Sequence, residues 1–259
     1  MTRAFHVYIG FLIVFIMAPI LIVAVVSFSG GKVPEFPPKS FSFQWYDYAL
    51  NYSLFTRSAV NSAWLALIST VIAAPIAVAA ALAIVRKRFP GRDAIQTFLL
   101  APLIVPSIVI GLSILLGFAT VGIRDIFFRL IGAHVLITFP YLVRTVIASL
   151  SRVDVTVEEA ARTLGANNWR TFWHVTLPLI RPGIIAGMLF SFIVSFDNVS
   201  VSLFLTSART NTLPLAILSY VEFNFDPSIA AISTMLILFS LGAAVILERV
   251  VGLRKVLGV

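Results

Sequence analysis

The residues with the clearest potential for chemistry lie in the stretch SFIVSFDNVSVSLFL, where Asp197 interrupts a run of apolar side chains. Ser195 and Asn198 flank this acid, and Ser200 follows it closely. At helical spacing Asp197 shares a face with Ser200 and roughly with Ile193, which predicts a polar stripe on an otherwise apolar helix. An acidic group on such a stripe would attract a cation.

The surroundings of this acid follow from the composition. Of 259 residues, 59% are apolar and 12% are charged, whereas an ordinary soluble domain is about 45–50% apolar. A helix needs about 20 mostly apolar residues to cross a bilayer. Six such stretches occur, at approximately residues 8–28, 60–85, 95–120, 133–150, 184–206 and 229–248. We therefore predict an all-α integral membrane protein, with residues 1–259 forming a single transmembrane domain.

Helices are favoured over a membrane β-barrel because runs such as STVIAAPIAVAAALAIV are apolar on every face. The first stretch is longer than the apolar core of a signal peptide, so we expect an uncleaved span. Asp197 would then lie near the middle of the fifth span, where ionisable groups usually mark a transport path. Two alternatives are a charge paired with a base of a neighbouring subunit and a carboxyl group kept protonated by burial.

A second acidic region is the stretch YVEFNFDPSIAA, in which Glu222 and Asp226 alternate with aromatic residues, Tyr220 among them. Acids beside aromatic faces suit an ammonium group through Coulomb and cation–π attraction. The alternative is that Asp226 caps the helix that begins near Ser228, and that Glu222 is simply solvated.

Lysine and arginine residues predict the orientation of the chain, because loops on the cytoplasmic side of spans carry the excess. Twelve of them fall on one side and six on the other. The richer side holds Arg3, Arg86, Lys87, Arg88, Arg92, Arg152, Arg162, Arg170, Arg181, Arg249, Arg254 and Lys255. Both termini are therefore expected in the cytoplasm. The net charge of +8 is explained by this topology, and we expect no nucleic-acid partner, since no basic groove with stacking aromatics is visible.

Residues 153–183, called the EAA segment below, carry mixed charge between two apolar stretches. The pattern predicts a helix from Val155 to Leu164, capped by Asp154 or Thr156 and ended by Gly165. A second short helix is expected from a cap at Asn167 to Val175, before Pro178.

Two short polar helices of this kind would lie along the membrane surface. One interpretation is an interfacial hairpin with Trp169, Phe172 and Trp173 at headgroup level. The other is a docking surface for a partner protein. His134 and His174 are expected to be interfacial or docking residues.

The EAA segment resembles the conserved loop of binding-protein-dependent ABC importer permeases. Their pattern is E-A-A, three residues, G, nine residues and I-x-L-P. Here it is matched by Glu159, Ala160, Ala161, Gly165, Leu177 and Pro178, with Val175 in place of isoleucine. The resemblance implies a type I permease bundle of six transmembrane helices with a cytoplasmic coupling loop.

Partners are also implied by this resemblance. They are two cytoplasmic ATPase subunits, a second permease that is identical or, as in polyamine systems, a homologous different chain, and a periplasmic or extracellular solute-binding protein. The chain has no G-x-x-x-x-G-K-[ST] motif, so it is expected not to be an enzyme and to carry no cofactor, with ATP and Mg²⁺ on the partner ATPase. The expected location is the bacterial cytoplasmic (inner) membrane.

The solute is suggested by a narrower resemblance. Ser195, Asp197 and the run TLPLAILSYV are similar to spermidine/putrescine permeases, but Asn198 stands where a second acid is common in that subgroup. The substrate path would involve Asp197, Asn198, Ser195, Glu222 and Tyr220. Alternatives are another amine-bearing solute, such as an opine, an aminophosphonate or an amino acid derivative, and an ion-driven secondary transporter. The last is disfavoured because no internal repeat is visible.

Overall fold

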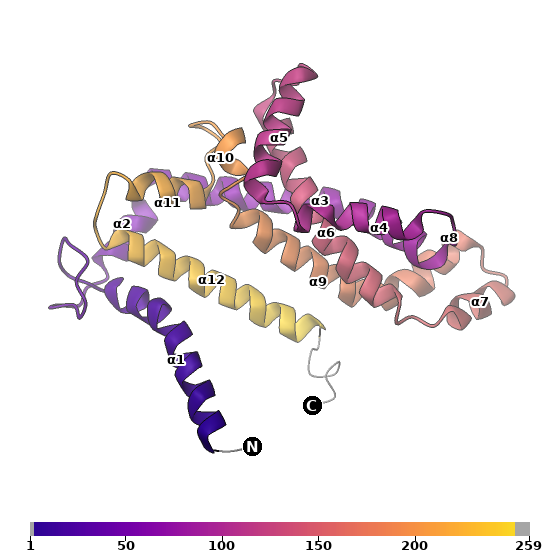
Figure 1. Ribbon diagram of the computed structural model, residues 1–259, viewed down its shortest axis with the longest axis horizontal. Helices are drawn as coiled ribbons and strands as arrows, with labels where there is room; N and C mark the ends of the chain where they lie inside the picture. The colour runs from indigo at the N-terminus through magenta and orange to yellow at the C-terminus, as the bar shows by residue number, and fades with distance from the viewer. Residues whose placement is uncertain (1–2, 252–259) are drawn as a thin grey trace. The chain divides into compact units, whose positions relative to one another are not determined.

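The computed structural model describes residues 3–251, which are helical apart from turns, loops and one isolated β-bridge between Ser29 and Phe41 (Figure 1). Arg254 and Lys255, assigned above to the basic side, lie outside this range. The chain forms two compact units. Within the described residues, the first contains 3–58 and Ala216–Gly242, and the second contains Ala59–Leu215 and 243–251.

The first unit is built from long apolar helices and a short connecting helix. It contains α1 (Arg3–Val26), α2 (Gln44–Asn51), the start of α3 (Ser53–Arg86), the end of α11 (Leu213–Val221) and most of α12 (Ser228–Val251). Only 6% of the apolar window of α1 is buried within the structure. An apolar helix this exposed needs hydrocarbon or another protein around it. Its backbone groups are hydrogen-bonded within the helix, but its apolar side chains are not packed against the rest of the structure.

The second unit is organised around α6 (Ile126–Leu150). This helix packs along α9 (Leu177–Phe196) and also contacts α4, η1, α5 and α10. The remaining elements are α4 (Arg92–Leu100), η1 (Ala101–Leu103), α5 (Ser107–Thr120), α7 (Val155–Thr163), α8 (Asn168–Thr171), the π turn η2 (Phe172–Thr176) and α10 (Ser202–Leu205).

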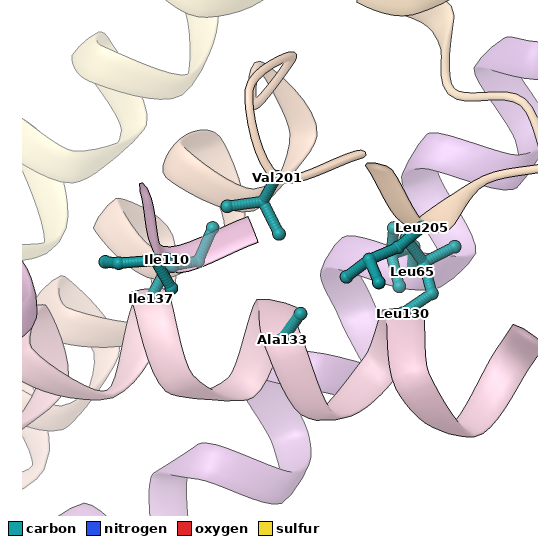
Figure 2. Packing of buried hydrophobic residues seen from close by; sticks show 7 residues of the cluster. All are labelled: Leu65, Ile110, Leu130, Ala133, Ile137, Val201 and Leu205. Carbon is teal, nitrogen blue, oxygen red and sulfur yellow. The ribbon is translucent and has the colours of Figure 1, made fainter. Parts of the chain in front are cut away.

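One buried apolar cluster of this unit holds the segment after α9 against α6. Figure 2 shows Val201 above Ala133 of α6, with Ile110 of α5 next to Ile137, while Leu205 lies close to Leu65 and Leu130. Because Val201 is fully buried, the short stretch between α9 and α10 is packed and is not a free surface loop.

The contact between α6 and α9 depends on two small residues of α9 spaced four apart. A Cβ on Gly187 would lie 3.2 Å from Leu142 Cα, and one on Gly183 would lie 3.1 Å from the Thr145 carbonyl oxygen. Such small-xxx-small pairs allow close approach of membrane helices. The sequence carries this signal as Gly183 and Gly187, four residues apart.

Five helices among residues 3–251 are long and apolar enough to span a membrane, or six if the bent pair around α4 and α5 is one span. The span expected over residues 95–120 is sharply bent, because Arg92–Leu103 and Ser107–Thr120 meet at 101°. Pro106 lies at this break, where its ring and missing N–H prevent a continuous helix.

The expectation for residues 184–206 also needs correction at both ends. The helix stops at Phe196, with Asp197 at its C-cap. At the other end, the short helix expected to finish before Pro178 instead continues, so that Asn168–Phe196 forms one candidate span. The π turn lies just before Pro178, and such a turn widens the helix where a proline cannot donate its hydrogen bond.

Candidate functional site

The EAA segment folds locally much as its sequence predicts. Asp154 caps α7 by accepting a hydrogen bond from the Thr156 backbone N–H at 2.9 Å, and this bond lowers the pKa of the Asp154 carboxyl group. Gly165 turns the chain with a φ of +90°, a conformation that costs glycine least. Asn167 then accepts from the Arg170 backbone N–H at 2.9 Å and caps α8.

The residues that carry the E-A-A match point outward. Glu159 and Ala160 are exposed, Ala161 is half-buried, and Leu164 is 89% exposed. Further on, Leu177 is half-buried and Pro178 is exposed at the start of α9. The outer face of the α7–α8 hairpin is therefore free to meet another surface.

Aromatic residues follow in α8 and in the π turn η2. The ring centroids of Trp169 and Trp173 are 5.5 Å apart, and those of Phe172 and Trp173 are 5.3 Å apart. Trp169 is 69% exposed. This geometry fits both a membrane interface and a partner groove.

Glu158 is the acidic residue of the hairpin whose role the sequence did not reveal. Its carboxylate is buried and accepts hydrogen bonds from Arg86 Nε at 3.2 Å, from Arg86 Nη2 at 3.1 Å and from Thr176 Oγ1 at 3.0 Å. From the sequence alone, Glu158 is an acid in the first turn of a helix, where a carboxylate suits the positive end of the helix dipole. Successive residues on a helix point about 100° apart, so Glu158 and Glu159 face different directions, but nothing local showed that Glu158 is the one that faces inward.

The second candidate site is the break between α9 and α10. The polar stripe expected on one helix face is wrong, because the helix ends before Asp197. Asp197 is exposed at the C-cap, and Asn198 Oδ1 accepts from the Val201 backbone N–H at 2.8 Å. Short polar side chains that bond to nearby backbone groups compete with helix in this way.

Ser195 does not line this exposed break. It is buried, and its Oγ lies 2.8 Å from His134 Nδ1. His134 Nε2 lies 3.2 Å from Ser202 Oγ, and Ser202 Oγ donates to the Asn198 carbonyl oxygen at 2.9 Å. Because that hydroxyl proton is committed to the carbonyl, His134 must carry its proton on Nε2 and accept from Ser195 on Nδ1.

The expectation that His134 is an interfacial or docking residue is therefore wrong. The residue is fully buried in α6 and links α6 to both sides of the break. Its partners are 61 and 68 residues away in sequence, so no local pattern pointed to it.

Tyr220 and its acidic neighbours lie in the first unit. Tyr220 is buried, and its hydroxyl donates to Asp226 Oδ2 at 2.7 Å. Burial raises the pKa of the Tyr220 phenol, which keeps it a donor. Asp226 Oδ1 accepts from the Ser228 backbone N–H at 2.9 Å and from the Ser228 hydroxyl group. Asp226 thus accepts a backbone N–H at the start of α12, as the capping alternative predicted. Glu222 is exposed.

Long apolar helices and the exposed polar α7–α8 hairpin fit a multi-pass membrane protein that meets another surface through this hairpin. Residues 73–253 match the family described as binding-protein-dependent transport system inner membrane component. The chain belongs to this family and is a transport permease of the inner-membrane, multi-pass type.

Individual relatives agree with this class. The chain is 32% identical over 237 residues to the spermidine/putrescine transport system permease protein PotC of Haemophilus influenzae, covering 92% of this chain and 91% of that protein. It is 30% identical to the putrescine transport system permease protein PotI of Escherichia coli K12, over 86% and 82% of the two chains. It is also 31% identical to the molybdenum transport system permease protein ModB of Haemophilus influenzae, over 64% and 80%.

Solved structures show the same fold. A bacterial ABC transporter involved in the import of the polysaccharide alginate matches with a TM-score of 0.72 at 18% identity, covering 96% of this chain and 98% of that chain. An amino acid ABC transporter matches with a TM-score of 0.61, also at 18% identity, over 80% and 97%. The fold is therefore that of an ABC importer permease, as the resemblance of the EAA segment implied.

Proposed function

We propose that this chain is one permease subunit of an ATP-driven importer of polyamines, spermidine or putrescine, in a bacterial cytoplasmic membrane. The observation that carries the proposal is the 32% identity to a spermidine/putrescine permease along more than nine tenths of both chains. Identity alone does not decide the solute, because the molybdenum permease is 31% identical over a shorter length.

The charge at the helix break supports a cationic solute. Asp197 is exposed at the end of a candidate span, and an acid in such a place marks a transport path more often than a structural element. Asn198 bonds to the backbone beside it and fixes the turn. We propose that Asp197 attracts the amine and that Ser195 acts indirectly, because its hydroxyl group is buried in a hydrogen bond. In the first unit, taken by itself, we propose that the exposed Glu222 attracts the amine and that Tyr220, whose hydroxyl is bound to Asp226, acts indirectly.

The assembly would contain two cytoplasmic ATPase subunits that bind ATP and Mg²⁺, a second permease that is a homologous different chain, and a solute-binding protein outside. Both termini and the EAA segment would face the cytoplasm. The exposure of Glu159 and Ala160, beside the sharp turn at Gly165, supports docking of the ATPase on this hairpin.

The test is ATP-dependent uptake of labelled putrescine and spermidine into proteoliposomes that hold the complete complex, with Asp197→Asn as the variant. A lost charge-assisted contact costs about 1.5–3 kcal/mol, so uptake at limiting amine should fall by roughly tenfold or more. Asp125→Asn is the matched control. Asp125 is an acid that caps α6 through the Phe128 backbone N–H, and asparagine caps equally well.

Labelled molybdate serves as the competing solute in the same vesicles. Uptake of either amine that depends on Asp197 supports the proposal. Uptake of molybdate without uptake of amine would refute the polyamine assignment and keep the permease class.

A further inference from the structure

We propose that Arg86 and Glu158 form the link through which movement of the α7–α8 hairpin reaches α3 and α9. The two residues would act as positioning residues behind the exposed docking face. This inference rests on the proposed function, since it concerns how an ATPase bound to the hairpin would drive the permease.

The geometry of the pair is that of a well-satisfied buried ion pair. The side chains of Arg86 and Glu158 are 16% and 4% exposed. Both Arg86 Nε and Nη2 bond to Glu158 Oε1, and Nη2 also donates to the Val153 carbonyl oxygen at 3.1 Å. Arg162 lies 3.9 Å from the other carboxylate oxygen. Buried charges persist only when they are paired and hydrogen-bonded in this way.

One carboxylate joins three elements of the chain. Arg86 is the last residue of α3, Glu158 lies in the first turn of α7, and Thr176 is the last residue of the π turn that leads into α9. The Thr176 hydroxyl donates to the same oxygen that Arg86 contacts. A displacement of α7 therefore acts directly on the ends of two candidate spans.

The attachment of α7 depends strongly on this contact. Within α7, all of which the structure describes, Glu158 is the one buried residue. Its apolar neighbours Val155 and Val157 are 43% and 46% exposed. Because α7 has little apolar core of its own, the ion pair takes the place that packed side chains occupy in other helices. The adjoining π turn is a second sign, since such turns are frequent at functional sites.

Adjacent acids provide the matched comparison. Glu158→Gln changes the buried acid, and Glu159→Gln changes its exposed neighbour. In the complete complex, Glu158→Gln should leave the ATPase subunits bound, because the outer face of the hairpin is unaltered, yet lower the amine transported per ATP hydrolysed. Coupling energies between sites correspond to about 5–150-fold, so we expect a fall of about tenfold. Glu159→Gln should instead weaken retention of the ATPase on purification.

Reversal of the pair adds a rescue test. Glu158→Arg alone should abolish coupled transport, and Arg86→Glu combined with Glu158→Arg should restore a measurable part of it. Normal transport per ATP in Glu158→Gln would overturn the proposal. Loss of bound ATPase in Glu158→Gln, in proportion to lost transport, would also overturn it and assign Glu158 to docking.

A distance measurement separates this inference from the proposed function. The chain has no cysteine, so spin labels can be placed at Ala83→Cys on α3 and Thr163→Cys on α7, both exposed positions. Double electron–electron resonance in lipid nanodiscs should give a narrow distribution of the distance between the two labels, and this distribution should broaden in Glu158→Gln. An unchanged distribution would defeat the link. Absence of amine uptake by the unaltered complex, with the distribution broadened as expected, would defeat only the polyamine assignment.

Discussion

Two regions of the second unit, the α7–α8 hairpin and the break after α9, each expose an acid that buried side chains hold in place, but the buried side chains differ in charge. The α7–α8 hairpin exposes Glu159 and is held from behind by the charged pair of Arg86 and Glu158. The break after α9 exposes Asp197 and is held from behind by neutral hydrogen bonds of His134 with Ser195 and Ser202. In each region a buried polar residue lies within two positions of the exposed acid. Glu158 precedes Glu159 and bonds to Arg86, and Ser195 precedes Asp197 and bonds to His134.

The difference follows from what surrounds each region. Arg86 lies at the very end of α3 and keeps some exposure, so water reaches part of the pair. His134 lies within α6, a candidate span, and is fully buried. An ionised group there would cost far more than a neutral one. A charged pair, Arg86 and Glu158, therefore holds α7 at the end of α3, whereas neutral hydrogen bonds of His134 hold the break after α9 within the apolar part of the unit.

The largest effect should come from breaking the charged anchor on one side only. Arg86→Met leaves Glu158 buried without its main partner, which costs about 3–5 kcal/mol. Arg86→Met with Glu158→Leu removes both charges and should cost clearly less, because no buried charge is left unpaired. Thermal unfolding of the complex in detergent micelles would measure both. A double variant less stable than the single one would contradict the buried-pair interpretation.

A smaller effect is expected at the neutral anchor. His134→Leu leaves the Ser195 hydroxyl group without its partner and removes a donor from Ser202, at a cost of about 1–3 kcal/mol. His174→Leu is the control for the free energy of unfolding, because His174 is exposed and surface substitutions usually change that energy by no more than about 0.5 kcal/mol. Uptake should report the same loss through a raised KM for the amine, since Asp197 is displaced. An unchanged KM would mean that His134 does not position the break.

Sequence reasoning succeeded where the determinants are local. The caps at Asp154 and Asn167 and the turn at Gly165 each depend on backbone groups within three residues. It failed where a distant partner decides. Which of two adjacent glutamates is buried depends on Arg86, 72 residues earlier than Glu158.

The ends of the apolar helices show the same limit. Beyond Gly187, the apolar run through residues 184–206 contains no glycine or proline to signal an end. The helix nevertheless stops at Phe196, where Asn198 caps the next turn and Val201 packs on α6. In contrast, Pro178 predicted a stop, and the helix continues through it directly after the π turn. Tertiary packing therefore set these boundaries.

The smallest effect tests whether the turn or the anchor holds the hairpin. A Cβ at Gly165 would meet no atom within 4 Å, so Gly165→Ala costs only the left-handed backbone conformation, about 1–2 kcal/mol. Gly165→Asn should cost less, because asparagine tolerates this conformation better. Hydrogen exchange of the amides of residues 155–171 would report the loss as faster local opening. If Gly165→Ala opened the hairpin more than Glu158→Gln, the turn at Gly165 would hold α7 in place. The Arg86–Glu158 pair would then not be the main attachment of α7.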